Sequence, residues 1–240
     1  MTSNKTLAVI QARMNSSRLP AKTLAKLGDK SLIEWIIART KKVFADQDIA
    51  VVTGNADINR KIIDLCQSKN IHVYSGSDED VFSRFIELKS RFPSYKYMLR
   101  ICADNPFISP ELMKNMLNFA KAKTLDITHT MQKMPDFPYV DGLGSELIYV
   151  DALEKLDTSF KLSQYDREHV TSRIYREPEI FKVEGLPCTN EYSFPKLKLD
   201  IDNLEDLEKI RKIIDFGNLS HESSDQDIIS KSLEFENRKY

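Results

Sequence analysis

Short apolar runs alternate with longer amphipathic stretches along residues 7–110 of the chain. The apolar runs have the length of buried strands, and the stretches between them place apolar residues on one side at helical spacing. The predicted strands are residues 7–11, 49–53, 71–75 and 97–101, and the predicted helices begin at Ser31, Asp57, Ser77 and Ser109. Buried strands separated by helices predict a mostly parallel sheet with helices on both faces, which is an α/β fold.

The alternation breaks after residue 130, where turn-forming residues gather. The prolines and glycines of this loop are Pro135, Pro138, Gly142 and Gly144. A strand at 146–150, a polar helix at 165–176 and a strand at 181–184 are predicted to follow the loop. We interpret residues 130–190 as an excursion from the sheet that serves acceptor binding or self-association.

The C-terminal part returns to the earlier pattern. Residues 196–200 predict one more parallel strand, and residues 204–216 predict a helix that Gly217 ends. We therefore expect one α/β domain over residues 1–217. The polar segment 218–240 has only a weak helical pattern, which is typical of a peripheral helix or a mobile tail.

Composition and charge exclude several classes of protein. The 240 residues carry a formal net charge of −1, so we expect no broad basic face for nucleic acid. The three cysteines are widely separated and the four histidines do not cluster, so neither set has the spacing of metal ligands. Cysteines of this kind suit a reducing cytosol. No signal peptide is apparent, and no apolar run is long enough to span a bilayer, so we expect a soluble cytoplasmic protein that binds no membrane.

Positive charge is concentrated near the start of the chain. Five cations and no acidic residue lie between Lys5 and Lys26, and three of them, Arg13, Arg18 and Lys22, fall in one loop after the first strand. In α/β proteins, a Ser- and Arg-rich loop between a strand and a helix presents donors to phosphate oxygens. The loop therefore predicts a nucleoside triphosphate or pyrophosphate as ligand. The alternative is a solvated basic loop that binds nothing.

Three carboxylates follow predicted strands, where ligands gather in a parallel sheet. Asp104 follows the strand at 97–101, and Asp200 and Asp202 lie at the end of the strand at 196–200. Side chains two residues apart on a strand share a face, so Asp200 and Asp202 are placed to share one cation. Mg²⁺ is typically bound by a few carboxylates and by substrate phosphates. The alternative is that Asp104 only forms a turn and that Asp202 only caps the next helix.

Residues 11–22 resemble the signature Ala-Arg-x-x-Ser-x-Arg-Leu-Pro-x-Lys of sugar cytidylyltransferases. The resemblance is to the spore-coat polysaccharide biosynthesis type, which is related to the CMP-sialic acid and CMP-Kdo synthetases. Residues 100–110, 167–171 and 200–208 resemble three further motifs of this family. One departure is Asn203-Leu204, where relatives often have Thr-Pro. The resemblance implies a single Rossmann-like nucleotidyltransferase domain that is usually dimeric.

The resemblance also implies roles for individual residues. The positions that match catalytic residues are Lys22, Arg13, Asp104 and Asp202. The positions that match the nucleotide-binding segments are Gln11, Ala12, Arg13, Ser17, Arg18, Lys22, Gly76, Asp80, Arg84 and Arg100. The positions that match Mg²⁺ ligands are Asp104 and Asp202, with Asp200 as a third. Arg167, Glu168 and His169 are placed to meet the acceptor across a dimer interface, and the alternative is that Arg167 and His169 make only structural hydrogen bonds.

Together these features predict an Mg²⁺-dependent nucleotidyltransferase. The resemblance implies that the hydroxyl of an acidic sugar attacks the α-phosphorus of CTP and that pyrophosphate leaves, for the synthesis of a surface polysaccharide or glycan. Two alternatives are a metal-dependent glycosyltransferase and a non-catalytic sugar-nucleotide-binding protein. We also expect a homodimer, because the aromatic and aliphatic residues of the excursion are too few for a core of their own. These residues are Phe137, Tyr139, Leu143 and Tyr149.

Overall fold

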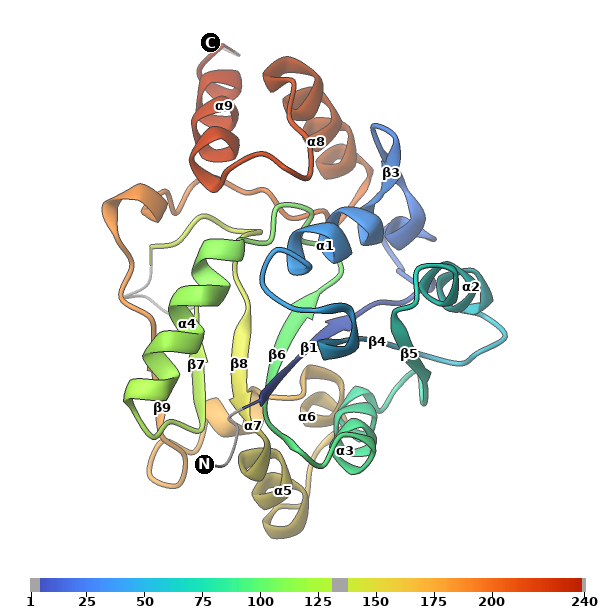
Figure 1. The fold of residues 1–240 in the computed structure, drawn as a ribbon, viewed down its shortest axis with the longest axis vertical. Coiled ribbons are helices and arrows are strands. Elements are labelled where there is room, and N and C mark those ends of the chain that lie inside the picture. Colours follow the sequence, from blue (N-terminus) through green and yellow to red (C-terminus); the bar gives the residue numbers. More distant parts are fainter. Residues whose placement is uncertain (1–4, 131–137, 239–240) are drawn as a thin grey trace.

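The computed structural model describes residues 5–130 and 138–238. A seven-stranded sheet with the order β5-β4-β1-β6-β8-β7-β9 forms its centre (Figure 1). The strands of this sheet are β1 (Lys5–Gln11), β4 (Ile49–Thr53), β5 (His72–Ser75), β6 (Tyr95–Cys102), β7 (Ile127–His129), β8 (Glu146–Tyr149) and β9 (Val183–Gly185). The first four are parallel to one another, β8 is antiparallel to β6 and β7, and β9 is parallel to β7. A separate hairpin consists of β2 (Lys26–Leu27) and β3 (Lys30–Ser31).

Helices cover both faces of the sheet, as the hydrophobic pattern predicts. The helices are α1 (Leu32–Thr40), α2 (Arg60–Ser68), α3 (Val81–Arg91), α4 (Pro110–Ala122), α5 (Val150–Ser159), α6 (Gln164–His169), α7 (Ser172–Tyr175), α8 (Leu204–Gly217) and α9 (Asp225–Asn237). Successive residues of β1 belong to two cores, with Ala8 and Ile10 in the first and Leu7 and Val9 in the second. The first core includes residues of α1, α2, α4, α8 and α9, and the second includes residues of α3, α5 and α7. A strand buried on both faces is apolar throughout, which explains the apolar runs in the sequence.

Several helices begin or end at other residues than predicted. α2 begins at Arg60 rather than near Asp57. α3 begins at Val81, because Asp80 caps it by accepting a hydrogen bond from Ser83 N (2.9 Å). The helix predicted at 165–176 is two helices, α6 and α7, separated by a turn.

Residues 130–190 contribute two strands to the sheet, contrary to the prediction that this part of the chain is an excursion from it. β8 pairs with β6 and β9 pairs with β7, so this part of the chain completes the sheet. Tyr139 and Leu143, expected to cover a second subunit, are instead buried in the first core of this chain. Two residues named in the sequence, Pro135 and Phe137, lie outside the described residues.

The prediction of a strand at 196–200 was also wrong. This segment forms a single β-bridge, between Lys198 and Asp141, in which Leu199 N donates to Asp141 O (2.9 Å). Gly142, at φ +95°, allows this close approach, because a Cβ there would lie 2.5 Å from Asp200 N. The loop carrying Asp200 therefore runs against the loop that precedes β8.

The C-terminal segment is attached by a buried ion pair. Arg39 on α1 has no exposed surface, and its guanidinium donates to Asp225 Oδ1 on α9 at 2.6 Å. The same guanidinium donates to Ile108 O (2.7 Å) and Ser223 O (2.9 Å). Gly217 does not end α8 as predicted, because it is the last helical residue and Asn218 takes the left-handed conformation after it. The domain boundary at 217 remains a prediction.

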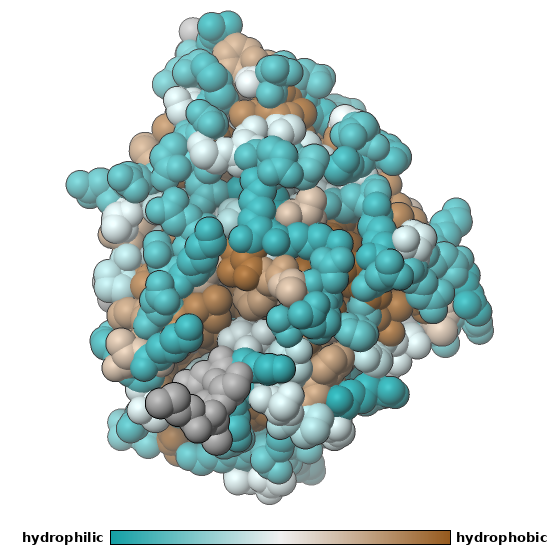
Figure 2. Space-filling view, in the orientation of Figure 1, coloured by the Kyte–Doolittle hydropathy of each residue, from teal (hydrophilic) through white to brown (hydrophobic). Residues whose placement is uncertain are grey.

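The surface is mostly hydrophilic on the side shown in Figure 2, with apolar side chains in its recesses. The large hydrophobic residues that are exposed in the described ranges lie apart in the sequence, and they are Ile58, Tyr165, Ile180 and Leu204. Within those ranges no helix has both the length and the apolar character to cross a bilayer.

Candidate active site

A cleft opens where the order of the parallel strands reverses. From β1 the chain passes to β4 and β5 on one side and then crosses back to β6 on the other. Such a switch point forms a crevice at the carboxyl ends of the strands. The cleft at this position has a volume of about 190 Å³. Its wall is formed by the segments that follow β1 and β6, together with residues of α3, α6 and the loop before α8.

Most residues singled out from the sequence line this cleft. They are Gln11, Ala12, Arg13, Ser17, Arg18, Lys22, Arg84, Arg100, Asp104, Glu168, His169 and Asp202. The predicted site residues that do not line it are Gly76, Asp80, Arg167 and Asp200. The lining residues that were not predicted are Ser16, Thr23, Val81, Cys102 and Ala103. Ser16 was recognisable, since it is the serine of the signature in the first loop.

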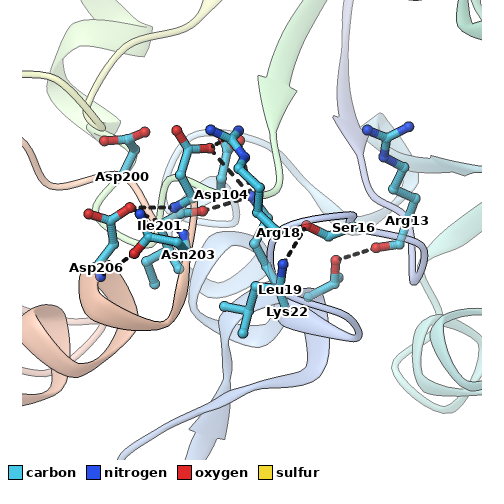
Figure 3. Close-up of polar contacts among 12 residues, drawn as sticks. Arg13, Ser16, Arg18, Leu19, Lys22, Asp104, Asp200, Ile201, Asn203 and Asp206 are labelled. Atoms are coloured by element: carbon cyan, nitrogen blue, oxygen red, sulfur yellow. Dashed lines mark hydrogen bonds and ion pairs between the residues drawn. The ribbon is translucent and has the colours of Figure 1, made fainter.

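The basic loop after β1 is held in shape by its own hydrogen bonds (Figure 3). Met14 O accepts from Ser16 N (3.0 Å) and from Ala21 N (2.9 Å), and Arg13 O accepts from Thr23 Oγ1 (2.8 Å). Ala21 turns the chain with a φ of 57°, which is uncommon for a residue with a Cβ. These contacts fix the backbone of the loop, so its cationic side chains are presented from a rigid support.

Two cations of the loop face two carboxylates (Figure 3). Arg18 donates to Asp202 Oδ1 at 2.7 Å. Lys22 Nζ donates to Ile201 O at 2.7 Å, and it lies 3.6 Å from Asp104 Oδ2 and 3.9 Å from Asp202 Oδ1. The segments that follow β1 and β6 thus meet the loop before α8 at one mixed cluster of charge.

The helix-cap interpretation of Asp202 was wrong. Asn203 is the cap of α8, because its Oδ1 accepts from Asp206 N (2.9 Å) while Asp206 Oδ2 accepts from Asn203 N (3.2 Å). The Asn203-Leu204 departure therefore supplies a good cap. The carboxylate of Asp202 remains in the cleft beside Lys22.

Asp104 lies in the turn after β6, as its alternative interpretation required. The turn itself is made by backbone groups, since Ile108 N donates to Asn105 O (3.1 Å). Asp104 O accepts from Ile201 N (2.8 Å), which joins this turn to the loop before α8. The side chain of Asp104 reaches Lys22, so it does more than form the turn.

Asp200 lies apart from the other two carboxylates. It does not line the cleft, and its Oδ1 is buried without a hydrogen-bond partner. Burial, together with the negative charge of Asp141, Asp202 and Asp104, raises the pKa of Asp200 to about 6, although Lys198 at 3.6 Å opposes the shift. The argument that Asp200 and Asp202 share a strand face does not hold, because the strand is not formed.

The donor set of the cleft suits a metal that arrives with a phosphate ligand. In residues 5–130 and 138–238, no three His, Cys, Asp or Glu side chains form a group that would hold a metal ion alone. Asp104 and Asp202 both line the cleft and share Lys22 as a neighbour. Mg²⁺ usually takes one or two carboxylates and completes its shell with phosphates and water. The pair fits that pattern.

Arg100 is bound to a glutamate that the sequence did not reveal. Its guanidinium donates to Glu146 Oε2 at 2.5 Å and to Gln11 Oε1 at 3.2 Å. Glu146 also accepts from Tyr175 OH (2.7 Å) and Thr171 Oγ1 (3.1 Å). Burial acts to raise the pKa of Glu146, but the charge of Arg100 and these hydrogen bonds outweigh it and lower the pKa. Arg100 therefore reaches the cleft as one half of a buried ion pair.

Arg84 fixes the loop between β5 and α3. Its Nε donates to Ser77 O (2.7 Å) and an Nη donates to Asp78 O (3.2 Å). Gly76 packs against the same side chain, since a Cβ there would lie 3.0 Å from Arg84 Cγ. Burial lowers the pKa of the Arg84 guanidinium from its ordinary value. Only Arg84 of the three predicted residues in this segment lines the cleft, while Asp80 caps α3.

A smaller hollow of about 60 Å³ adjoins the cleft and shares Arg100 and Cys102 with it. Its other lining residues are Asn105, Thr130, Val140, Asp141, Gly142, Gly144, Ser145 and Glu146. Ser145 is 4% exposed, and its Oγ has no hydrogen-bond partner. A buried hydroxyl without a partner is costly, so a polar ligand group is a fitting occupant.

A family model described as cytidylyltransferase matches residues 7–233. The chain belongs to the cytidylyltransferase family. It is 29% identical to the spore coat polysaccharide biosynthesis protein SpsF of Bacillus subtilis, over 88% of this chain and 86% of that protein. It is 25% identical to the 3-deoxy-manno-octulosonate cytidylyltransferase of Leptospira interrogans, over 87% of this chain and 83% of that protein.

The fold of this cytidylyltransferase has a solved counterpart. A cytidylyltransferase structure from Leptospira borgpetersenii superposes with a TM-score of 0.87 at 26% identity, covering 98% of this chain and 95% of that one. The resemblance inferred from the motifs is thereby confirmed, as is the α/β fold class. The protein is an enzyme of the nucleotidyltransferase class, so the glycosyltransferase and non-catalytic alternatives no longer apply.

Proposed function

We propose that this cytidylyltransferase transfers the cytidylyl group of CTP to an acidic sugar in the presence of Mg²⁺. The product is a CMP-sugar for a surface polysaccharide or glycan, and pyrophosphate is released. The observation that carries the proposal is the cluster in which Arg18 and Lys22 face Asp104 and Asp202 within one cleft. The choice of an acidic sugar is supported by the relative named for 3-deoxy-manno-octulosonate. The destination in a surface polysaccharide is supported by the relative named for spore coat polysaccharide biosynthesis.

The residues of the cluster exchange partners when substrate binds. The side chain of Arg13 and the side chains of Arg18 and Lys22 are the cations that receive the triphosphate. Asp104 and Asp202 are the residues that would hold Mg²⁺ once Arg18 and Lys22 contact phosphate oxygens. Bound there, Mg²⁺ would supply positive charge to the phosphate oxygens. The cations of the loop stabilise the charge that develops on pyrophosphate as the sugar oxygen bonds to the α-phosphorus.

One polar group of the acceptor enters the small hollow beside the cleft. Asn105 and Ser145 offer neutral polar groups for sugar hydroxyls, and this hollow meets the cleft at Arg100 and Cys102. An acceptor there lies next to Asp104, which precedes Asn105 in the same turn. Glu168 and His169 in the wall of the cleft complete the acceptor side.

The proposed enzyme is a homodimer. The support is the resemblance to a family that is usually dimeric. Tyr139 and Leu143 add no support from apolar side chains, because both are already buried in this chain. Sedimentation at micromolar concentration is expected to give twice the chain mass of 27.7 kDa. A single species of monomer mass would contradict this part of the proposal.

The activity is tested by pyrophosphate release with each of the four nucleoside triphosphates against sugar acids and sugar phosphates. Turnover is expected with CTP and a sugar acid in the presence of Mg²⁺. In thermal melts with Mg²⁺, CTP at 100 times its dissociation constant is expected to add about 2.7 kcal/mol to the free energy of unfolding. At the same CTP concentration without Mg²⁺, the gain is expected to be smaller. Equal shifts with all four nucleotides, or none with any, would contradict the proposal.

A matched variant tests the carboxylates. Asp202→Asn keeps the shape of the side chain and its acceptor for Arg18 but removes the charge proposed to hold Mg²⁺. Turnover is expected to fall by roughly 10²-fold or more, as for loss of one electrostatic contact to a transition state. Stability changes little, because Asn203 caps α8. Asp215→Asn, at an exposed position of α8, is the control. Near-full activity of Asp202→Asn at limiting Mg²⁺ would remove the assignment.

A further inference from the structure

The helix that carries Glu168 and His169 to the cleft is too short to be stable alone. α6 spans Gln164–His169 and contains six residues. Isolated helices of this length do not persist in water, so tertiary contacts must hold α6 in place. Two contacts join it to the loop before α3, because Arg167 pairs with Asp80 Oδ2 at 2.7 Å and Gln164 Nε2 donates to Glu79 O at 3.2 Å.

Asp80 uses its two carboxylate oxygens for different elements. Oδ1 accepts from Ser83 N (2.9 Å) and caps α3, while Oδ2 accepts from Arg167 on α6. Arg84, one turn into α3, holds the same loop through Ser77 O. The ion pair therefore fixes α6 to a part of the molecule that is itself anchored beside the nucleotide cleft.

A strained turn holds the other end of α6. Val170 has φ 56° and ψ −60°, and Thr171 N donates to His169 O. This is a γ-turn with a positive φ at its centre, a rare conformation and an unfavourable one for a β-branched residue. It persists because the Val170 side chain is fully buried and Thr171 Oγ1 is bonded to Glu146 (3.1 Å). Such strain occurs where surrounding structure imposes a particular direction on the chain.

The two ends together decide which side chains of α6 reach the cleft. Glu168 and His169 line it, and the ring of Tyr165 lies 4.2 Å from the ring of His169 and supports it. Arg167 does not line the cleft. Its guanidinium is directed to Asp80, with 37% of the side chain exposed against 26% for Asp80.

We propose that Arg167 is a positioning residue and does not bind the acceptor. Through Asp80 it holds α6 against the rest of the molecule, so that Glu168 and His169 form a wall of the cleft. The Val170 turn fixes the direction from which they enter. This inference rests on the proposed function, because it assigns a role within the same site.

Hydrogen exchange without substrate tests the positioning directly. Arg167→Gln and Asp80→Asn both remove the ion pair, and asparagine preserves the cap of α3. Backbone amides of residues 164–169 are expected to exchange about two- to fivefold faster in either variant. The control is Arg173→Gln on α7, which breaks the pair of Arg173 with Glu177 at a similar side-chain exposure of 32%. Unchanged exchange in Arg167→Gln, or an equal change in the control, would overturn the proposal.

A double-mutant cycle with His169→Ala tests how Arg167 acts on turnover. Arg167→Gln is expected to lower kcat/KM roughly tenfold when His169 is present, and to have a clearly smaller effect in His169→Ala, where only Glu168 remains to be misplaced. Arg167→Lys should recover part of the loss. An equal rise in acceptor KM on both backgrounds would show direct acceptor binding and overturn the proposal. Hydrogen exchange is measured without turnover, so it tests the role of the ion pair even if the proposed function is wrong.

Discussion

Lys22 joins two loops that are far apart in the sequence. Its ammonium donates to Ile201 O and lies between the carboxylates of Asp104 and Asp202, with 13% of the side chain exposed. The sequence alone places this lysine in a solvated loop, where its loss would leave the free protein unaffected. The structure instead gives it a structural contact in addition to its proposed role at the triphosphate.

Lys22→Ala is therefore expected to lose both activity and stability. Removing a charge-assisted hydrogen bond worth about 1.5–3 kcal/mol lowers kcat/KM for CTP by roughly 10- to 150-fold. Without ligand, loss of the bond to Ile201 O and exposure of two carboxylates to each other cost about 1.5 kcal/mol. In a chain of this size that lowers Tm by about 3–6 °C. Lys22→Arg should recover only part of the activity, because a planar fork replaces a compact ammonium.

The measurements are kcat/KM under saturating Mg²⁺ and a thermal melt of the free protein. An alanine variant with activity within twofold of wild type would remove the phosphate-binding role of Lys22. An unchanged melt would show that the contact with Ile201 O contributes nothing.

The pair of helices α6 and α7 depends on one acidic side chain. Asp166 accepts from Ser163 Oγ (2.6 Å) and Ser172 Oγ (2.9 Å), and it pairs with Arg176. Burial acts to raise the pKa of Asp166, but these hydrogen bonds and the positive charge outweigh it and lower the pKa to about 2. The folded state thus favours the carboxylate of Asp166 over the acid.

This depressed pKa predicts a stability that depends on acid pH. The contribution is complete above the ordinary carboxyl pKa near 4 and is lost as pH falls toward 2, with a total of about 2 kcal/mol. Asp166→Asn is therefore expected to be less stable than wild type at pH 7 and equally stable near pH 2. Urea unfolding at a series of pH values measures the difference. A gap between the two proteins that does not narrow with acid would contradict the assignment.

The loop of Gly142 supports the loop that carries the carboxylates. Gly142→Ala is expected to destabilise the fold by more than about 3 kcal/mol, because the added Cβ would meet backbone atoms 2.5 Å away at a positive φ. Gly28→Ala is the matched control, since Gly28 also has a positive φ (63°) but nothing lies within 4 Å of its Cβ position. It is expected to lose only about 1 kcal/mol in denaturant unfolding. Equal losses would show that the contact with residues 199–200 is unimportant.

Much of the parallel half of the sheet was predictable because its central strands β1 and β4 are buried on both faces. Such strands are apolar throughout, and local helices separate them along the chain. The position of β8 between β6 and β7 was not predictable, because the sequence of a short strand does not indicate which strands it pairs with. Residues 196–200 show the opposite error, since Leu197 and Leu199 alternate as in a strand but are buried beside a single bridge. Alternation reports burial of every second residue, and it does not report a hydrogen-bonded ladder.

The site shows the same division between local and distant information. The loop of residues 11–22 is contiguous, so its cations could be recognised together. Glu146 binds Arg100 from another strand, and Asp80 binds Arg167 across 87 residues of chain. The spacing of residues in the sequence does not indicate such pairs, because only the fold brings the partners together.

At the scale of the whole molecule, α9 completes the first core through Asp225. Asp225→Ala would leave the fully buried guanidinium of Arg39 without its ion-pair partner. The expected loss of unfolding free energy is about 3–5 kcal/mol, as for removal of one member of a buried ion pair. Glu234→Ala on the same helix is the control, because that side chain is 45% exposed and its ion pair with Lys231 lies at the surface. Urea unfolding measures both variants, and an equal loss of unfolding free energy in the two would contradict the prediction.

The same ion pair sets an order of events during synthesis. Arg39 and Asp225 are separated by 186 residues. At a translation rate of about 5–20 residues per second, roughly 10–40 s pass between the emergence of the two residues from the ribosome. During that interval the guanidinium lacks its carboxylate, so the full burial of Arg39 at the end of α1 is completed only after Asp225 has emerged. A ribosome stalled before residue 225 therefore holds a chain in which Arg39 has not met its ion-pair partner.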